Sequence, residues 1–228
     1  MALKDRGSIT SAMKGSAVNI EDMFSTYVYT GTGVALDIVN GIDLATDGGM
    51  VWIKARSATS DNKLFDTDRG GANSLSSNLT GAESIYSGFI SSFNNNGFSL
   101  GNAGTTNGSG NTYASWTFKK QPRFFDMVKY TGDGTTSRTI NHNLDCDVGM
   151  IIIKGIDGIL GWFTWHKNIG TDGYLQLNSG DAVGNSNTAF SGASNTAPTT
   201  TSFTVGNYNG VNLNGGEYIA YLFAHDPD

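Results

Sequence analysis

The sequence of 228 residues is poor in cysteine, proline and charge. Its single cysteine, Cys146, excludes an internal disulfide. Charged residues make up 15% of the chain, well below the usual quarter, and there are 3 prolines. No run of about 20 apolar residues is present, and the N-terminus lacks the apolar stretch of a signal peptide. We therefore expect the chain to be made in a cytoplasm and not to insert into a membrane.

Basic residues are also few. Lys and Arg number 14 against 20 Asp and Glu, which gives a formal net charge of −6. Nucleic acid is not expected as a partner, because binding phosphates would need a basic stripe. The one basic cluster is the run 119–123, which contains Lys119, Lys120 and Arg123, and we interpret it as a solvated linker.

Glycine and uncharged polar residues take the place of the missing charges. The chain has 31 glycines and is rich in Asn, Ser and Thr. It is 38% hydrophobic and 11% aromatic, which is enough to build cores. This composition favours short strands joined by tight turns and disfavours long helices.

The chain repeats itself. Four blocks recur in the same order at a spacing of roughly 100 residues, which indicates a tandem duplication. We expect an N-terminal segment at residues 1–25 and two modules at residues 26–121 and 122–228. The recurring blocks are Tyr29–Gly33 with Tyr130–Gly134, Gly49–Lys54 with Gly149–Lys154, Phe98–Asn102 with Phe203–Asn207, and Tyr113–Phe118 with Tyr218–Phe223.

Residues 1–25 are not repeated. A short helix is predicted over Ser8–Gly15, with Ser8 as its N-cap and Gly15 beyond its end. A second short piece is predicted at 20–24. The segment either docks on another protein or caps the first core, and the sequence leaves both open.

Each copy shows six or seven strand signals at close spacing and no long helix. Such a pattern predicts an all-β protein with two tandem antiparallel β-sandwich modules of the jelly-roll type. One predicted strand runs over Ile85–Phe93 and forms a hairpin with Gly97–Leu100. Apolar positions kept in both copies are the expected core: Met50/Met150, Ile53/Ile153, Phe65/Phe163, Phe98/Phe203, Tyr113/Tyr218 and Phe118/Phe223.

No catalytic residue, metal site or cofactor is predicted, and the protein is not expected to be an enzyme. Three acidic residues of the first copy, Asp66, Asp68 and Glu83, are candidates for a glycosidase pair, but the second copy has Thr164 and His166 instead. His166, which the repeat aligns with Asp68, is the only histidine of functional interest. A turn is expected at His142 and an exposed position at His225. Three oxygen donors lack the full spacing of a calcium loop: Asn143, Asp145 and Asp147.

Aromatic residues are the remaining resource for binding. Trp162 and Trp165 lie three apart in one predicted strand, so they point to opposite faces. One is expected in the core. The other either forms a platform for stacking a sugar ring or lies in a subunit interface. The alternative is that both are buried.

The motif order resembles a family of bacteriophage virion proteins that is common in phages of marine bacteria and cyanobacteria, over about residues 27–226. The modules of that family are similar to concanavalin-A-like and laminin-G-like sandwiches. The motifs are Tyr29–Gly33, Ile42–Leu44, Gly49–Arg56, Leu64–Gly70, Asn94–Gly101, Asn107–Gly110 and Tyr113–Phe118, most of which recur in the second copy.

The resemblance implies a virion structural protein, with a tail location favoured over the capsid surface and synthesis in the host cytoplasm. As a tail-associated fibre or receptor-binding component, it would attach to other virion proteins through residues 1–25. Its loops would meet a host surface glycan or protein, and the chain would form a homo-oligomer, with a trimer favoured. The resemblance defines no receptor-binding residues. The alternatives are a capsid decoration protein and a polysaccharide depolymerase.

Overall fold

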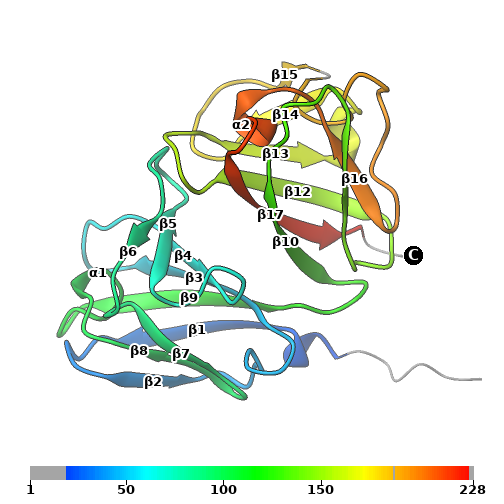
Figure 1. The fold of residues 1–228 in the computed structure, drawn as a ribbon. Coiled ribbons are helices and arrows are strands. Elements are labelled where there is room, and N and C mark those ends of the chain that lie inside the picture. The colour runs from blue at the N-terminus through cyan, green and yellow to red at the C-terminus, as the bar shows by residue number, and fades with distance from the viewer. Residues whose placement is uncertain (1–18, 187, 226–228) are drawn as a thin grey trace, which may run out of the picture.

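The computed structural model describes residues 19–186 and 188–225 of the chain. It is all-β, and two modules each place a six-stranded antiparallel sheet against a smaller sheet (Figure 1). The predicted all-β sandwich architecture is confirmed. The helix predicted over Ser8–Gly15 lies outside the described residues.

The first module follows a 3₁₀ helix, η1, whose N-cap Asn19 accepts a hydrogen bond from the N–H of Glu21. Its large sheet has the order β1-β9-β3-β4-β5-β6, and its small sheet has the order β2-β8-β7. The elements are η1 (Ile20–Asp22), β1 (Phe24–Thr30), β2 (Leu36–Val39), β3 (Gly49–Ala55), β4 (Lys63–Asp66), β5 (Asn73–Ser76), β6 (Ser84–Ile85), β7 (Ile90–Asn94), β8 (Gly97–Leu100), α1 (Gly104–Asn107) and β9 (Thr112–Lys119).

The second module repeats this order. Its large sheet is β10-β17-β12-β13-β14-β15, and its small sheet pairs β11 with β16. The elements are β10 (Phe125–Thr131), β11 (Arg138–Asn141), β12 (Val148–Gly155), β13 (Trp162–His166), η2 (Lys167–Ile169), β14 (Gly173–Gln176), β15 (Gly184–Asn185), β16 (Ser202–Val205), α2 (Asn209–Asn212) and β17 (Glu217–Ala224).

The strand prediction was incomplete. The described residues form nine strands in the first module and eight in the second, against the six or seven expected per copy. The strand predicted over Ile85–Phe93 is two strands, β6 and β7, separated by turn residues. It is interrupted because the N–H of Phe89 turns back to the carbonyl oxygen of Tyr86, at 3.2 Å.

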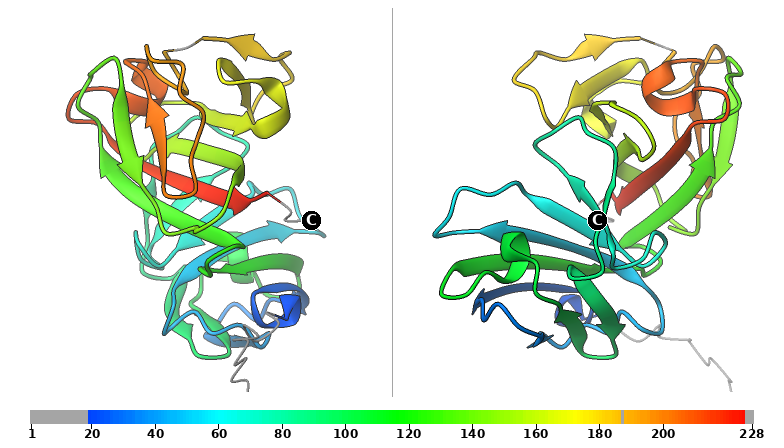
Figure 2. Two further views of the ribbon diagram at one scale, coloured as in Figure 1. Left: turned by 90° about the vertical axis from the view of Figure 1, so that its right-hand side faces the viewer. Right: turned by 60° about the vertical axis from the view of Figure 1, so that its left-hand side comes forward.

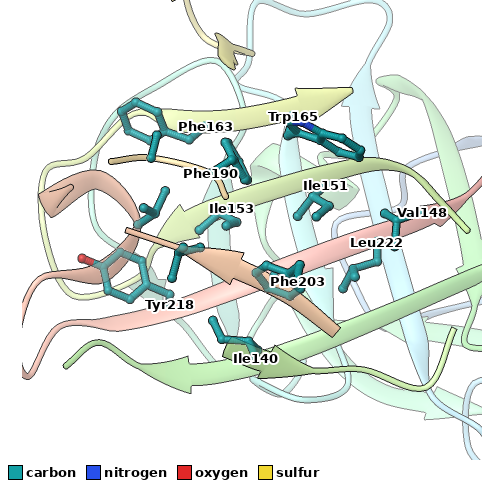
Figure 3. Packing of buried hydrophobic residues seen from close by; sticks show 14 of the residues in the cluster. Ile140, Val148, Ile151, Ile153, Phe163, Trp165, Phe190, Phe203, Tyr218 and Leu222 are labelled. Carbon is teal, nitrogen blue, oxygen red and sulfur yellow. The ribbon is translucent and has the colours of Figure 1, made fainter. Parts of the chain in front are cut away.

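Each module has its own apolar core between its two sheets. In the second module, Ile151 and Ile153 of β12 pack with Phe163 and Trp165 of β13 and with Phe203 of β16 (Figure 3). The corresponding cluster of the first module includes Val51, Ile53, Phe65, Phe98 and Tyr113. Four of the six predicted core pairs lie in these two clusters.

A third core lies between the modules, where the two large sheets meet (Figure 2). Successive residues of β3 point to opposite faces, so Val51 and Ile53 enter the module core while Met50 and Trp52 face the other module. The remaining predicted pairs, Met50/Met150 and Phe118/Phe223, belong to this third core. Both sheets therefore have two covered faces where they meet, which agrees with the unbroken apolar runs of β3 and β12.

A buried ion pair joins the modules beside this third core. Asp66 is fully buried, and its Oδ2 accepts hydrogen bonds from Nε of Arg69 at 2.7 Å and from the phenol of Tyr221 at 2.6 Å. Arg69 also reaches Oε2 of Glu83 at 3.1 Å. Burial holds the pKa of Tyr221 well above its ordinary value, so its hydroxyl stays a donor to the carboxylate. A buried carboxylate needs such partners, because an unpaired charge there would be very costly.

The end of β5 and the loop that follows it add backbone contacts across the junction. The indole N–H of Trp162 donates to the carbonyl oxygens of Ser76 and Leu79, at 3.0 and 3.1 Å. The ammonium group of Lys154 donates to the carbonyl oxygens of Thr80 and Gly155, at 3.2 and 2.6 Å. Carbonyl oxygens of the first module thus accept hydrogen bonds from the buried Trp162 and Lys154 side chains of the second.

The basic run at the junction is not merely a solvated linker. Lys119 pairs with Asp47 at 2.7 Å. Lys120 lies between Asp68 of the first module and Asp126 of the second, at 3.7 and 3.5 Å. Lys120 can contact both carboxylates because the linker runs between the two acidic side chains.

The repeated Tyr-Thr-Gly-x-Gly motif is a structural clamp. In the first module the fully buried Asn107 accepts a hydrogen bond from the N–H of Thr32 at 2.8 Å and donates to the carbonyl oxygens of Val34 and Gly101, at 2.6 and 2.7 Å. A Cβ on Gly31 would lie 2.4 Å from the carbonyl oxygen of Gly108, so only glycine fits at this position.

The second module builds the same clamp. Asn212 accepts from the N–H of Asp133 at 2.9 Å and donates to the carbonyl oxygen of Thr135 at 3.0 Å. Stacked tyrosines support both clamps, with centroid distances of 5.1 Å for Tyr29–Tyr113 and 5.2 Å for Tyr130–Tyr218. The most recognisable repeated motifs therefore stabilise a turn within each module.

Replacing Asn107 with alanine should lower the free energy of unfolding by about 2–4 kcal/mol, because it removes a fully buried side chain that is the hydrogen-bond partner of three backbone groups. Chemical denaturation followed by tryptophan fluorescence measures the change. Asn96→Ala is the control: Asn96 is exposed, and its hydrogen bonds to described residues are made by its backbone carbonyl oxygen. A loss for Asn107→Ala no larger than that of the control would contradict the clamp.

Lys154 should make stability depend on pH. Its burial, and then the charge of Arg69, lower its pKa to about 8 from the ordinary 10.5. Between these values the unfolded chain keeps a proton that the folded chain has lost, so the free energy of unfolding rises with pH. Denaturation from about pH 7.5 to 9.5 should show that Lys154→Met lacks this rise. The exposed-lysine control, Lys167→Met, should keep it, and parallel profiles for wild type and Lys154→Met would refute the assignment.

Candidate functional site

An aromatic groove lies on the part of the first module's large sheet that the second module leaves open. It has a volume of about 340 Å³ and is lined by Trp52, Lys54, Asn62, Trp116 and Phe118. We call it the Trp52–Trp116 groove. Its lining is largely apolar with a few polar groups, which is the usual make-up of a small-molecule binding site.

The strand register places the two tryptophans together. Trp52 of β3 and Trp116 of β9 are direct cross-strand partners, so both side chains stand on the same face of the sheet. Their ring centroids are 6.4 Å apart and the rings are inclined at 68°. Both side chains are half-buried. The pair therefore presents ring surface to a ligand from a rigid position.

Polar groups border the groove on one side. The ammonium group of Lys54 donates to the carbonyl oxygen of Ser60, which fixes the position of the charge. The side-chain amide of Asn62 bonds to no described residue and has both a donor and an acceptor to offer. The indole N–H of Trp52 is buried without an acceptor among the described residues. Lys54 and Asn62 therefore suit a ligand with an apolar face and hydroxyl groups at its rim, whereas the buried N–H of Trp52 is not open to the groove.

The second module has no such groove, because the same face is covered. Its counterpart of the Trp52–Trp116 pair is Ile152–Tyr221, and both side chains are in the third core. Asn62 directly precedes β4, and its counterpart in the second module is Trp162, which is fully buried. The duplication therefore leaves one open aromatic face in the described part of the chain.

Two other hollows are weaker candidates. A wide cleft of about 520 Å³ lies beside the clamp of the first module, where Tyr86 donates to the side-chain oxygen of Asn102 at 2.8 Å. A hollow of about 280 Å³ lies between Trp165 and Pro198. There the indole N–H of Trp165 already donates to the carbonyl oxygen of Gly170, at 2.8 Å. In both hollows the polar end of the main aromatic side chain is thus already bonded within the protein.

The sequence was right that Trp162 and Trp165 point to opposite faces. Trp165 packs in the core of the second module and Trp162 in the third core. Both are buried, so neither forms an exposed platform. The sequence did not identify Trp52 and Trp116 as a pair. Each tryptophan lies in a predicted strand, which was the one available sign, but the strand register is needed to show that they are partners.

The acidic candidates do not converge on a groove. Asp66 and Glu83 share Arg69 in the buried ion pair, while Asp68 faces Lys120. The alignment that matched Asp68 with His166 and Phe65 with Phe163 was wrong. The register pairs Met50 with Asp66 and Met150 with His166, so Asp66 and His166 are counterparts, and so are Phe65 and Trp165.

The histidines serve local structure. Nδ1 of His166 accepts the N–H of Asn168 at 3.2 Å and caps η2. Nδ1 of His142 accepts the N–H of Leu144 at 3.2 Å in the loop after β11, and burial lowers the pKa of this histidine. His225 is exposed, as predicted.

Two of the three residues considered for calcium make contacts with neighbouring side chains. Asp147 lies 3.6 Å from Lys167, and the N–H of Asn143 donates to Asp126 at 2.7 Å. Within residues 19–186 and 188–225, no group of three or more His, Cys, Asp or Glu side chains is placed to hold a metal ion. In the same residues, no helix has the length and apolar character required to cross a membrane.

Comparison with known proteins supplies a family but no activity. No curated protein and no solved structure matches the chain. The model of one family, described as a domain of unknown function (DUF7483), matches residues 19–227. That match covers both modules and the groove, and the chain belongs to this family.

Proposed function

We propose that the protein is a bacteriophage virion structural component, a tail-associated adhesin that holds a host surface glycan in the Trp52–Trp116 groove. The observation that carries the glycan assignment is the pair of half-buried tryptophans facing one open groove. The virion assignment rests on the resemblance of the repeated motifs to phage structural proteins.

The chemistry of the groove supports a sugar ring as ligand. One face of a pyranose is made of C–H groups and packs against an aromatic ring, while its hydroxyl groups need polar partners at the edge. The groove offers ring surface from Trp52 and Trp116 and polar partners from Asn62 and Lys54. No carboxylate lines it, so its lining offers binding groups and no acid pair for hydrolysis.

The surface composition is consistent with the same role. With 15% charged residues and many Asn, Ser and Thr side chains, the protein presents hydrogen-bonding groups without strong charge. A capsid decoration protein is the alternative proposal, and this composition suits it equally. Imaging of a labelled protein in the particle separates the two, since an adhesin belongs on the tail and a decoration protein on the head.

Trp116→Ala should weaken glycan binding at least tenfold, about 1.4 kcal/mol, because it removes one of the two ring surfaces. An array of bacterial surface glycans identifies a ligand, and titration calorimetry with that ligand measures the loss.

Tyr86→Ala is the matched control, because Tyr86 is 45% exposed and lines the wide cleft of the same module. Binding by this variant should equal that of wild type. Silence across the array, or equal weakening by the two substitutions, would refute the groove as the glycan site.

A further inference from the structure

The strand β1 forms an open edge of the first module's large sheet. It pairs with β9 on one side, and no described strand pairs with it on the other (Figure 1). The edge is seven residues long, and Tyr27 and Val28 are 37% and 59% exposed. A long strand with free backbone groups and exposed apolar side chains is a template for pairing with another strand.

The composition of this edge is unusual for an unpaired strand. Phe24–Thr30 contains no charged residue and no proline, the two common means of preventing edge-to-edge association. The strand β10 occupies the same place in the second module and carries Lys129 where β1 carries Val28. Lys129 is exposed and lies 3.4 Å from Glu217. One copy of the duplicated edge is thus protected by charge, and the other is not.

We propose that β1 pairs with β1 of a second copy of this chain, antiparallel and across a two-fold axis. Such a contact is self-complementary, because each strand meets its own residues in reverse order. An uncharged strand tolerates this arrangement, whereas a lysine at position 28 would bring two ammonium groups together across the axis. The edge supports a dimer in place of the trimer expected from the sequence.

The pairing has a consequence for ligand display. Thr26 pairs with Trp116 and Val28 with Ala114, so these side chains share the face that carries the Trp52–Trp116 groove. Antiparallel pairing keeps that face on one side of a continuous sheet across both copies. Two grooves would then open in the same direction. If the proposed glycan function holds, they would engage neighbouring sugars and raise the apparent affinity.

Light scattering coupled to size-exclusion chromatography of the full chain tests the dimer without any glycan. Wild type should have twice the 24.1 kDa chain mass at micromolar concentration, and Val28→Lys should have the monomer mass. Thr26→Lys, at a second exposed position on the same strand, should also give a monomer. The control is Val34→Lys, which places the same charge at a 64% exposed valine away from β1 and should remain dimeric.

Amide hydrogen exchange locates the contact. Residues 24–30 should exchange faster in Val28→Lys than in wild type, whereas residues 112–119 should be unchanged. A monomeric wild type, a trimer, or a dimer that survives both lysine substitutions would overturn the proposal. A Trp116→Ala variant that no longer binds glycan should still be a dimer, which would show that β1 pairing does not depend on glycan binding.

Discussion

The packing of one large sheet against the other is the constraint on which the rest of this structure depends. Alternation along β3 and β12 sends one set of side chains into each module core and the other set toward the neighbouring module. Residues such as Met50, Ile152 and Trp162 are buried only because the second sheet covers them. Unfolding of one module would therefore expose the inner face of the other, so the two modules are expected to be coupled in stability.

Polar groups make this packing specific. An apolar surface alone would allow the two sheets to slide, but the Asp66 carboxylate must meet both Arg69 and Tyr221. The indole N–H of Trp162 and the ammonium group of Lys154 must likewise find carbonyl oxygens in the loop that follows β5. Each requirement is satisfied in one relative placement of the modules, because an unpaired buried polar group is costly.

Divergence between the copies explains where function can reside. The clamp residues Asn107 and Asn212 do the same work in both modules, so the repeated motifs describe the fold. The differences lie on the sheet faces turned toward the other module, where the half-buried Trp52–Trp116 pair of one copy corresponds to the buried Ile152–Tyr221 pair of the other. A face that is covered in one copy is available for binding in its duplicate.

The all-β class, the duplication and most of the buried positions could be predicted from the amino-acid sequence, because strand alternation and tight turns are local properties and the repeat marks equivalent sites. The sequence also correctly placed Trp162 and Trp165 on opposite faces. That Trp162 is covered and that Trp52 meets Trp116 could be learned from the folded chain alone, since both facts depend on contacts between distant segments. The structure also shows that Asp66 matches His166, because strand register is set by hydrogen bonds across the sheet, whereas likeness of residue types along the chain, as between Phe65 and Phe163, indicates a different match.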